Sequence, residues 1–153
     1  MMSLTIRPAV LADLDAIWAI ESAVFSGDAW SRGMIEEELT GEHRQYLVLI
    51  DAEGGIRGYG GLLVVGETGD IQTVALAPEV RGGGYGRRLM DALLDAAALQ
   101  AVSEVFLEVR ADNPVAQSLY LGIGFAQIAV REKYYQPEGV DAIVMRLQMK
   151  ERR

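Results

Sequence analysis

The sequence lacks cysteine entirely, and its 153 residues include one histidine, His43, and two lysines, Lys133 and Lys150. Without cysteine there can be no disulfide, no thiolate metal ligand and no cysteine nucleophile. A single histidine cannot by itself build a metal centre or a serine triad of the usual kind. His43 also lies in the polar stretch GEHRQ, which is typical of a surface loop. The sequence therefore predicts chemistry that uses no metal.

Long apolar runs and an excess of positive charge are missing as well. No apolar run approaches the roughly 18 residues of a membrane span, and the N-terminal end lacks the basic and apolar segments of a signal peptide. We therefore expect a cytoplasmic protein that contacts no membrane. The net charge of −8 argues against nucleic acid as the main partner. With 50% hydrophobic and 24% charged residues, the chain is typical of one soluble globular domain, residues 1–153.

The negative charge is concentrated at one end of the chain. Residues 1–60 contain ten acidic residues against four arginines, whereas residues 102–153 contain seven of each sign. An acidic part of this kind attracts a basic acceptor, although surface charge that only contacts solvent gives the same pattern.

The stretch Ile71–Met90 combines the end of a strand, a glycine-rich loop and the start of a helix. Its apolar and β-branched residues stop at Pro78, which removes a backbone donor and is expected to end the strand. The helix that follows is amphipathic, and its apolar face consists of Leu89, Met90, Leu93, Leu94 and Ala97. The loop between them contains Gly82, Gly83, Gly84 and Gly86. So little side-chain bulk allows the N–H groups at the helix start to approach a bound group.

Arginines flank this loop, and their charge indicates the kind of ligand. Arg81 precedes the glycines, and Arg87 and Arg88 follow them, at a helix end where stability alone would favour acidic residues. This arrangement suits a bound anion, although a glycine turn with ordinary surface arginines remains the alternative. A Walker loop is excluded because neither lysine is near, and a dinucleotide fingerprint starting at Gly82 would need glycine in place of Arg87.

The remaining pattern, Arg81-x-x-Gly84-x-Gly86 between a strand and a helix, resembles the signature of the GCN5-related N-acetyltransferases. In that family the loop holds the pyrophosphate of acetyl-coenzyme A. The C-terminal half, LEVRADNPVAQSLYLGIGF followed by KYYQPEGVDAIVM, is similar to the RimI-type ribosomal-protein-alanine N-acetyltransferases. The resemblance covers essentially the full length and implies acetyl-coenzyme A as the acyl donor.

Hydrophobic periodicity and turn residues predict the element order βααβββαβαββ. The expected strands are 4–7, 45–51, 56–65, from 71 to the proline, 104–110, 125–131 and 141–149, and the expected helices start near Asp13, Ser31, the glycine loop and Asn113. The fold class is α/β: a mixed central sheet of about seven strands with helices on both faces, antiparallel hairpins at its two ends and one βαβ unit supplying a splayed parallel pair in the middle. In the first helix, an apolar stripe interrupted by Glu21 is expected to face the core, and KYYQPEG is expected to form a turn or loop.

Acetyl transfer to an amine needs a base for the amine proton and an acid for the departing thiolate. Glu108 lies near the C-terminal end of its strand, where open α/β sheets place ligands, and an apolar cleft beside Phe106 would raise its pKa. The resemblance assigns the base to Glu108 and the acid to Tyr120. From the residues alone, a solvated or arginine-paired glutamate remains the alternative for Glu108, and Tyr120 could equally be a core aromatic.

The resemblance also implies contacts with the coenzyme and the acceptor. The coenzyme-binding residues would be Val74, Ala75, Leu76, Arg81, Gly82, Gly83, Gly84, Tyr85, Gly86, Arg87 and Asn113. Trp30, Tyr134 and Tyr135 could line the acceptor groove, or could simply pack in the core.

The acceptor expected from the resemblance is the N-terminal α-amino group, with alanine as its residue, of a ribosomal or other basic protein. An α-amino group with a pKa near 8 is about a tenth neutral at pH 7, whereas a lysine with a pKa near 10.4 is neutral at only a few parts in ten thousand. One ordinary carboxylate therefore suits the α-amine better. The alternatives are an acetyltransferase for lysine side chains or a small polyamine, and a non-catalytic acyl-coenzyme A binding module. We expect a monomer or a weak dimer.

Overall fold

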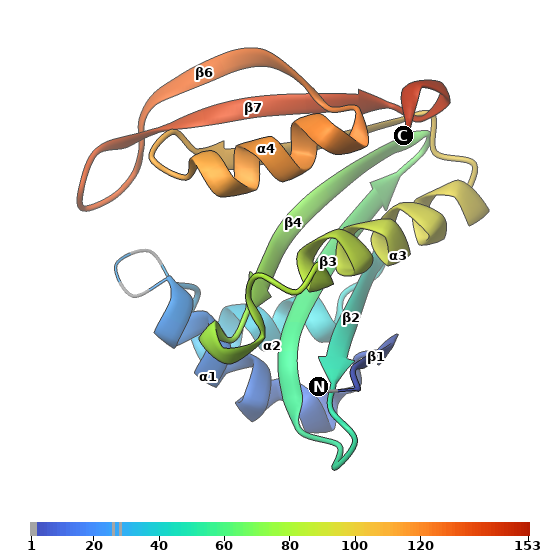
Figure 1. Cartoon of the computed structure of the whole chain (residues 1–153), viewed down its shortest axis with the longest axis vertical. Coiled ribbons are helices and arrows are strands. Elements are labelled where there is room, and N and C mark those ends of the chain that lie inside the picture. The colour runs from blue at the N-terminus through green and yellow to red at the C-terminus, as the bar shows by residue number, and fades with distance from the viewer. Residues whose placement is uncertain (1–2, 26, 28) are drawn as a thin grey trace.

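A seven-stranded sheet forms the centre of the computed structural model, which describes residues 3–25, 27 and 29–153. The strands follow the order β1-β2-β3-β4-β5-β7-β6 (Figure 1). They are β1 (Thr5–Pro8), β2 (Arg44–Ile50), β3 (Ile56–Val65), β4 (Thr68–Leu76), β5 (Glu104–Arg110), β6 (Ala126–Tyr135) and β7 (Val140–Gln148). The helices are α1 (Leu14–Val24), α2 (Arg32–Thr40), α3 (Tyr85–Leu99) and α4 (Pro114–Ile123). This is the predicted order of elements and the predicted α/β class.

The middle of the sheet contains its parallel pair, β4 and β5, and this pair opens after a short contact. The register joins Thr68 with Glu104, Gly69 with Val105 and Asp70 with Phe106, and the pairing stops there. Helix α3 connects the two strands as a crossover, and Figure 1 shows β4 curving away from β5 and β7. The remaining neighbours in the sheet pair antiparallel. The predicted splayed parallel pair is therefore confirmed.

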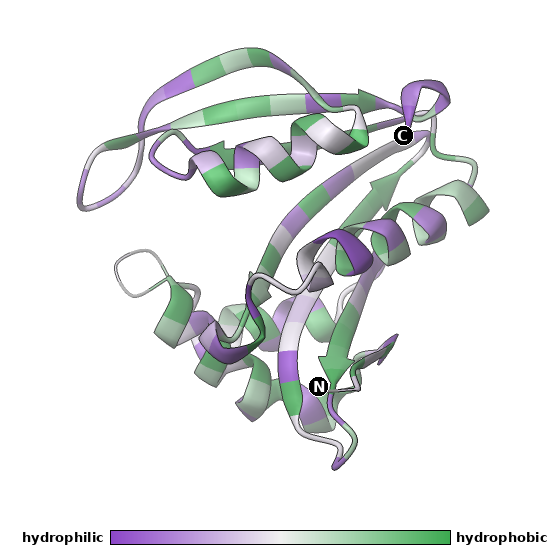
Figure 2. Cartoon of the chain, viewed as in Figure 1, coloured by the Kyte–Doolittle hydropathy of each residue, from purple (hydrophilic) through white to green (hydrophobic). Residues whose placement is uncertain are grey.

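The two faces of the sheet carry different helices. The predicted apolar face of α3 is fully buried in the larger core cluster, with the five residues named above at 0% exposure. Hydrophobic and hydrophilic residues alternate along this helix in Figure 2. Helix α4 ends in the same cluster through Ile123, whereas α1 and α2 bury Leu14, Ile17 and Ile35 in a second cluster. Helices on both faces hold the sheet in place and leave the splayed pair open between them.

A β-bulge in β4 changes which residues face each side of the sheet. In the pairing of β3 with β4, Leu62 lies opposite Ile71 and Gly61 lies opposite Thr73, so Gln72 has no partner in the register. An extra residue shifts the alternation of a strand by one position. Consequently the regular pattern expected from the sequence does not continue through β4, and consecutive residues can point toward the same space.

Several predicted boundaries were wrong, and one of them affects the site. Strand β6 continues to Tyr135, where a turn or loop from Lys133 was expected, so the tyrosine pair belongs to the strand. Helix α3 begins at Tyr85, which places Gly86 in its first turn rather than in the loop. Helix α4 continues through Gly122 to Ile123, and the next residue, Gly124, has a φ of 119° that suits a helix stop.

The stripe predicted for α1 also needs one correction. Trp18 is 40% exposed, and Ile20 packs in the core instead. Helix α2 begins as predicted, because the Ser31 side chain accepts a hydrogen bond from the Met34 N–H at 3.2 Å. In the described part of the chain, no helix is both long and apolar enough to cross a membrane.

Candidate active site

Three adjoining cavities follow the opening between β4 and β5. The loop cavity, of about 640 Å³, lies between the glycine loop and α4. The central cavity, of about 190 Å³, shares Val74, Asn113 and Tyr120 with it. The outer cavity, of about 430 Å³, shares four lining residues with the central one: Trp30, Gln72, Glu108 and Tyr135. Because neighbouring cavities share lining residues, the three form one continuous groove across the sheet.

The loop cavity is built mainly from backbone and apolar side chains. Gly82 and Gly84 have φ angles of 82° and 83°, in the left-handed region that glycine adopts without strain. Gly84 is the N-cap of α3, and the first hydrogen bond of the helix runs from Arg88 N to the Gly84 carbonyl at 3.2 Å. The N–H groups that come before Arg88 in the first helical turn have no acceptor within the helix, and such groups can bind an anion.

Two arginines at the loop cavity are held in place by bonds within the protein. The Arg81 Nε and Nη2 atoms each donate to the Leu76 carbonyl at 3.2 Å. The Arg87 Nε atom lies 3.2 Å from a carboxylate oxygen of Asp91, and its Nη2 donates to the Arg153 carbonyl at 2.6 Å. Their positive charge is therefore fixed at the rim of the cavity. Arg88 turns away, because it lies over the Tyr85 ring and donates to the Leu4 carbonyl.

Most of the predicted coenzyme-binding residues line this cavity. Those lining it are Val74, Ala75, Leu76, Arg81, Gly82, Gly84, Gly86, Arg87 and Asn113. Gly83 and Tyr85 do not line it. The Tyr85 side chain packs against the cluster around Val80 instead, because the helix starts at this residue and directs its side chain toward β1.

Asn113 caps α4 and also lines the groove. Its Oδ1 atom accepts a hydrogen bond from the Ala116 N–H at 3.2 Å, and Pro114 occupies the first helical turn, as the sequence predicts. Capping fixes the side chain at the boundary between the loop cavity and the central cavity.

Tyr120 is both a packed aromatic and a lining residue of two cavities. Its ring meets Phe125 edge-on, with centroids 6.0 Å apart, and packs against the larger core cluster. Burial raises the pKa of Tyr120 to about 12. The hydroxyl therefore stays protonated at neutral pH and can donate a hydrogen bond into the groove.

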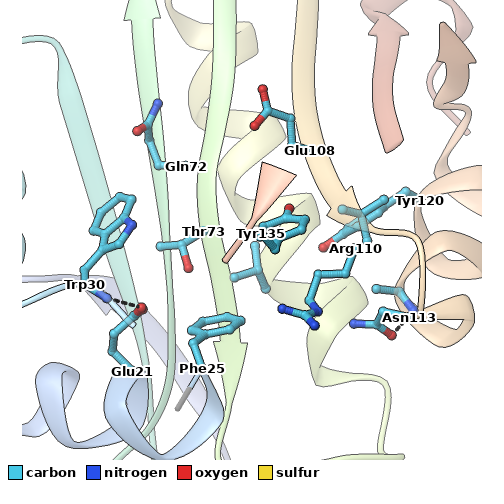
Figure 3. A pocket seen from close by; sticks show the side chains of 13 residues that line it. Glu21, Phe25, Trp30, Gln72, Thr73, Glu108, Arg110, Asn113, Tyr120 and Tyr135 are labelled. Atoms are coloured by element: carbon cyan, nitrogen blue, oxygen red, sulfur yellow. Dashed lines mark hydrogen bonds between the residues drawn. The ribbon is translucent and has the colours of Figure 1, made fainter. Parts of the chain in front are cut away.

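Glu108 has more polar surroundings than the apolar cleft expected from the sequence. The Arg131 Nε atom lies 3.4 Å from Glu108 Oε1, and the Tyr134 hydroxyl donates a hydrogen bond to the carboxylate, which raises the pKa of Tyr134. Glu108 nevertheless lines both the central and the outer cavity. Figure 3 shows it on β5 together with Arg110, across the central cavity from Gln72 and Thr73 of β4. The carboxylate is thus paired with an arginine and open to both cavities.

The three aromatic residues predicted for the acceptor side all line the groove. Trp30 and Tyr135 line the central and outer cavities, and Tyr134 lines the outer one. The two tyrosine rings meet edge-on with centroids 5.1 Å apart. Guanidinium groups lie over both rings, with Arg131 at 5.5 Å from the Tyr134 centroid and Arg110 at 5.2 Å from the Tyr135 centroid. These contacts fix the aromatic wall of the groove.

Glu21 is a functional candidate that sequence reasoning assigned only to the core stripe. It is 2% exposed and still lines the central cavity. One carboxylate oxygen accepts the Trp30 N–H at 2.9 Å, and the other is hydrogen-bonded to the Tyr59 hydroxyl. The single acidic residue within an apolar stripe was the available signal, because a buried carboxylate must have partners. Glu21 therefore fixes the backbone at Trp30 and thereby the wall of the cavity.

Asp70 and Gln72 were also missed. Both line the outer cavity, and the Gln72 amide donates to Asp70 Oδ2 at 3.3 Å. Burial and the nearby Glu108 carboxylate raise the pKa of Asp70 to about 6, and Arg131 opposes this shift. The sequence hid these residues because the strand was expected to start at Ile71, and because the bulge at Gln72 leaves no local signature.

The arrangement is suited to acid–base chemistry on organic groups. Within the described residues, no group of three histidine, cysteine or acidic side chains could hold a metal ion. Along the groove lie, in order, the N-terminal turn of α3, the protonated hydroxyl of Tyr120 and the carboxylate of Glu108. Such a row can hold a long anionic donor at one end and an amine at the other.

Comparison with known proteins agrees with this geometry. The sequence model described as "Acetyltransferase (GNAT) family" matches residues 14–125. The chain belongs to this family. GNAT enzymes take the acyl group from acetyl-coenzyme A, and the chain is accordingly an acyltransferase. The resemblance inferred from the loop and the C-terminal motifs is confirmed.

Among sequences, the chain is similar to "N-alpha-acetyltransferase RimI" of Mycobacterium tuberculosis, with 35% identity across 93% of this chain and 90% of that protein. It is 30% identical to the "[Ribosomal protein bS18]-alanine N-acetyltransferase" of Haemophilus ducreyi, across 93% of this chain and 98% of that one. It is 38% identical to the uncharacterised protein ML0378 of Mycobacterium leprae, across 88% of this chain but only 38% of that longer protein.

Among solved structures, the chain is similar to the ribosomal-protein-S18-alanine N-acetyltransferase from Escherichia coli. The TM-score is 0.88 at 30% identity, and the match covers 96% of this chain and 94% of that one. Ard1 from Thermoplasma volcanium matches with a TM-score of 0.84 at 26% identity, across 95% and 97% of the two chains. The fold and the RimI-like character of the chain are therefore established together.

Proposed function

We propose that this chain transfers the acetyl group of acetyl-coenzyme A directly to the N-terminal α-amino group of an alanine-initiated protein, in particular a ribosomal protein of the bS18 type. One observation carries the proposal: Glu108 and Tyr120 both line the central cavity, which joins an anion-binding loop cavity to an acidic outer cavity. The names of the Mycobacterium tuberculosis and Haemophilus ducreyi relatives, an N-alpha-acetyltransferase and a bS18-alanine N-acetyltransferase, support the same reaction.

The loop cavity suits the donor. Acetyl-coenzyme A supplies a thioester carbonyl at the end of a long arm that begins at a pyrophosphate. The first-turn N–H groups of α3, with Arg81 and Arg87 at the rim, would hold the pyrophosphate. Backbone groups of β4 at Val74 to Leu76 would hold the arm, because in the described part of the chain no strand pairs with β4 on that side beyond Asp70. Their hydrogen-bonding groups are then available to an extended ligand.

Glu108 would accept the proton that the acceptor ammonium must lose before its nitrogen can attack. A free amine is required because the ammonium has no lone pair. The attack forms the new C–N bond as the C–S bond breaks, the nitrogen loses its second proton to become an amide, and the thiolate takes up a proton to leave as the thiol of coenzyme A. Glu108 opens to both the central and the outer cavity, so it can contact an amine placed between them. Arg131 and Tyr134 would hold its carboxylate in one orientation.

Tyr120 would donate to the sulfur that departs. Its hydroxyl is protonated at neutral pH, because burial raises its pKa to about 12. An ordinary thiol has a pKa near 8.5, so complete transfer of this proton to the thiolate is uphill. We therefore expect the Tyr120 hydrogen bond itself to stabilise the departing thiolate, with the proton following as solvent re-enters.

The test uses purified protein, acetyl-coenzyme A and two matched peptides. One peptide begins with a free alanine, and the other has the same sequence with an acetylated N-terminus and carries internal lysines. Mass spectrometry should find acetylation of the free N-terminus alone. Equal acetylation of lysines in the blocked peptide would overturn the proposal in favour of a lysine acetyltransferase. Binding of coenzyme A without transfer to either peptide would favour a non-catalytic module.

A natural acceptor can be identified in the same way. The ribosomal proteins of a bacterial strain that lacks its own bS18 acetyltransferase would be analysed with and without this chain. Acetylation of the bS18 N-terminus only when the chain is present would support the assignment. If only other proteins were acetylated at their N-termini, the proposed reaction would stand and bS18 would be excluded as its substrate.

A further inference from the structure

Asp70 lines the outer cavity on the same sheet face as Glu108, and the proposed mechanism does not use it. In the parallel pairing Asp70 lies opposite Phe106, and Glu108 follows two residues later on the same side of β5. Among the described residues, no arginine or lysine lies within 4 Å of the Asp70 carboxylate, and its hydrogen bond is to the neutral Gln72 amide at 3.3 Å. Arg131, which does not line the cavity, pairs with Glu108 instead.

The placement of Asp70 beside Glu108 lowers the stability of the folded protein when both carboxylates are charged. Asp70 is half-buried and faces a second carboxylate, and both effects disfavour its charged form. The described residues that line the outer cavity include two carboxylates, Asp70 and Glu108, and no basic side chain. A cation that entered this cavity would relieve the repulsion, and the acceptor amine of the proposed reaction enters as a cation.

The aromatic residues of the cavity point to the same kind of ligand independently of the carboxylates. Trp30, Tyr134 and Tyr135 line it together. Aromatic faces attract ammonium groups, and the guanidinium of Arg131 already lies 5.5 Å from the Tyr134 ring centroid. Carboxylates and aromatic rings in one cavity are the chemistry that selects an ammonium group.

We propose that Asp70 is an acceptor-binding residue that attracts and orients the protonated α-amine in the outer cavity before Glu108 removes its proton. The inference rests on the proposed function, since it concerns the acceptor of that reaction. It assigns different tasks to the two carboxylates. Asp70 contributes to binding of the charged acceptor, and Glu108 contributes to the chemical step.

The test measures binding without turnover, so that it does not depend on catalysis. The wild-type protein and Asp70→Asn would be saturated with coenzyme A, which carries no acetyl group. Each would then be titrated by calorimetry with an alanine-initiated peptide that contains no lysine or arginine, and with its N-acetylated counterpart. The free peptide then differs from the blocked one only in its α-ammonium group.

We expect Asp70→Asn to weaken binding of the free peptide about tenfold at pH 7.5 and to leave binding of the blocked peptide unchanged. Glu104→Gln is the matched control, because it removes one charge from the same face of β5 and does not line the three cavities. It should bind like wild type. Asp70→Glu keeps the charge and should retain most of the affinity.

The pH dependence provides a readout that a purely structural role would not change. Asp70 faces Glu108 of β5 and both Arg131 and Tyr134 of β6, and its pKa is about 6. The difference between wild type and Asp70→Asn should therefore shrink as the pH falls from 7.5 to 5, where the carboxyl group becomes neutral. Equal loss for both peptides, no loss for either, or a difference independent of pH would overturn the inference.

The two proposals can fail separately. Peptide acetylation by wild-type protein decides the proposed function, whereas the calorimetric comparison decides the role of Asp70. Transfer to the free peptide with unchanged affinity in Asp70→Asn would overturn this inference alone. Asp70-dependent binding without transfer would support it and overturn the proposed function.

Discussion

The loop cavity and the outer cavity lie at opposite ends of one groove and are built in different ways. The loop cavity takes most of its lining from two continuous stretches, 74–87 and 110–120. The outer cavity takes single residues from the segment before α2, from β4, from β5 and from the end of β6. The first uses glycines, backbone groups and an apolar floor, whereas the second uses carboxylates and aromatic side chains.

This difference separates what the two ends can recognise. Backbone N–H groups at a helix start bind any suitable anion, so the loop cavity can serve one donor whatever acceptor is used. Side chains brought together from distant strands determine charge and shape, so under the proposed function the outer cavity would decide which acceptor binds. Changes at the loop cavity should therefore alter donor binding, and changes at the outer cavity should alter acceptor binding or turnover.

The largest expected effect comes from Glu108→Gln, at the carboxylate that lines both the central and the outer cavity. Removing the proposed base should lower kcat by about 100-fold or more, while the affinity for coenzyme A stays near wild type. Initial rates and calorimetry would measure the two quantities. Glu104→Gln on the same strand should change neither quantity. Unchanged turnover in Glu108→Gln would show that another group removes the proton.

Tyr120→Phe should have the next largest effect, because Tyr120 lies where the loop and central cavities meet. Losing one hydrogen bond to a charged leaving group should lower kcat by about 10- to 100-fold. The phenyl ring retains the edge contact with Phe125, so the melting temperature should change little. A loss of stability without a loss of kcat would instead identify Tyr120 as a packing residue only.

At the loop cavity, Gly84→Ala should weaken coenzyme A binding by about tenfold. The φ of Gly84 is 83°, and an L-residue in this region costs about 1–2 kcal/mol, which would move the loop. Gly122→Ala is the matched control, because it lies inside α4, away from positive φ and with open space around it. It should stabilise the protein by up to about 1 kcal/mol and leave coenzyme binding unchanged. Equal binding by both variants would contradict the loop assignment.

The smallest effect concerns stability at the outer cavity. The pKa of Asp70 is raised from 3.8 to about 6, so the folded protein binds a proton between these values that the unfolded chain does not. Its charged form therefore destabilises the fold above pH 6, and the penalty disappears as the pH falls toward 4. Asp70→Asn should raise the melting temperature by a few degrees at pH 7.5 and should not change it near pH 4. A lower melting temperature at pH 7.5 would contradict the repulsion between the two carboxylates.

Much of the loop cavity could be predicted because its determinants are local. A strand, a glycine loop and a helix start follow one another in 20 residues, and the capping pair Asn113-Pro114 marks α4 in the same way. Two members of that prediction, Gly83 and Tyr85, do not line the cavity. The helix begins at Tyr85 rather than after Gly86, and this small change in start turns the Tyr85 side chain toward β1.

The outer cavity could be predicted only in part. The aromatic residues were identified from the resemblance, but Tyr134 and Tyr135 were placed in a turn and proved to lie in β6. Asp70 and Gln72 gave no sequence signal, because their place in the cavity depends on how β4 pairs with β3 and β5. Glu21 stood out as one acidic residue in an apolar stripe, yet its partners are Trp30 and Tyr59, the latter 38 residues away.

The sequence by itself determined the order of the elements, the family and the helix start that suits an anion, because each depends on residues that are neighbours along the chain. The tertiary structure alone decided that Arg131 pairs with Glu108, that Asp70 faces the same carboxylate, and that Glu21 fixes the backbone at Trp30. Charge interactions act through space over a few ångströms, so the pairing of the strands decides which charged side chains interact. The residue pattern of a single strand does not contain this information.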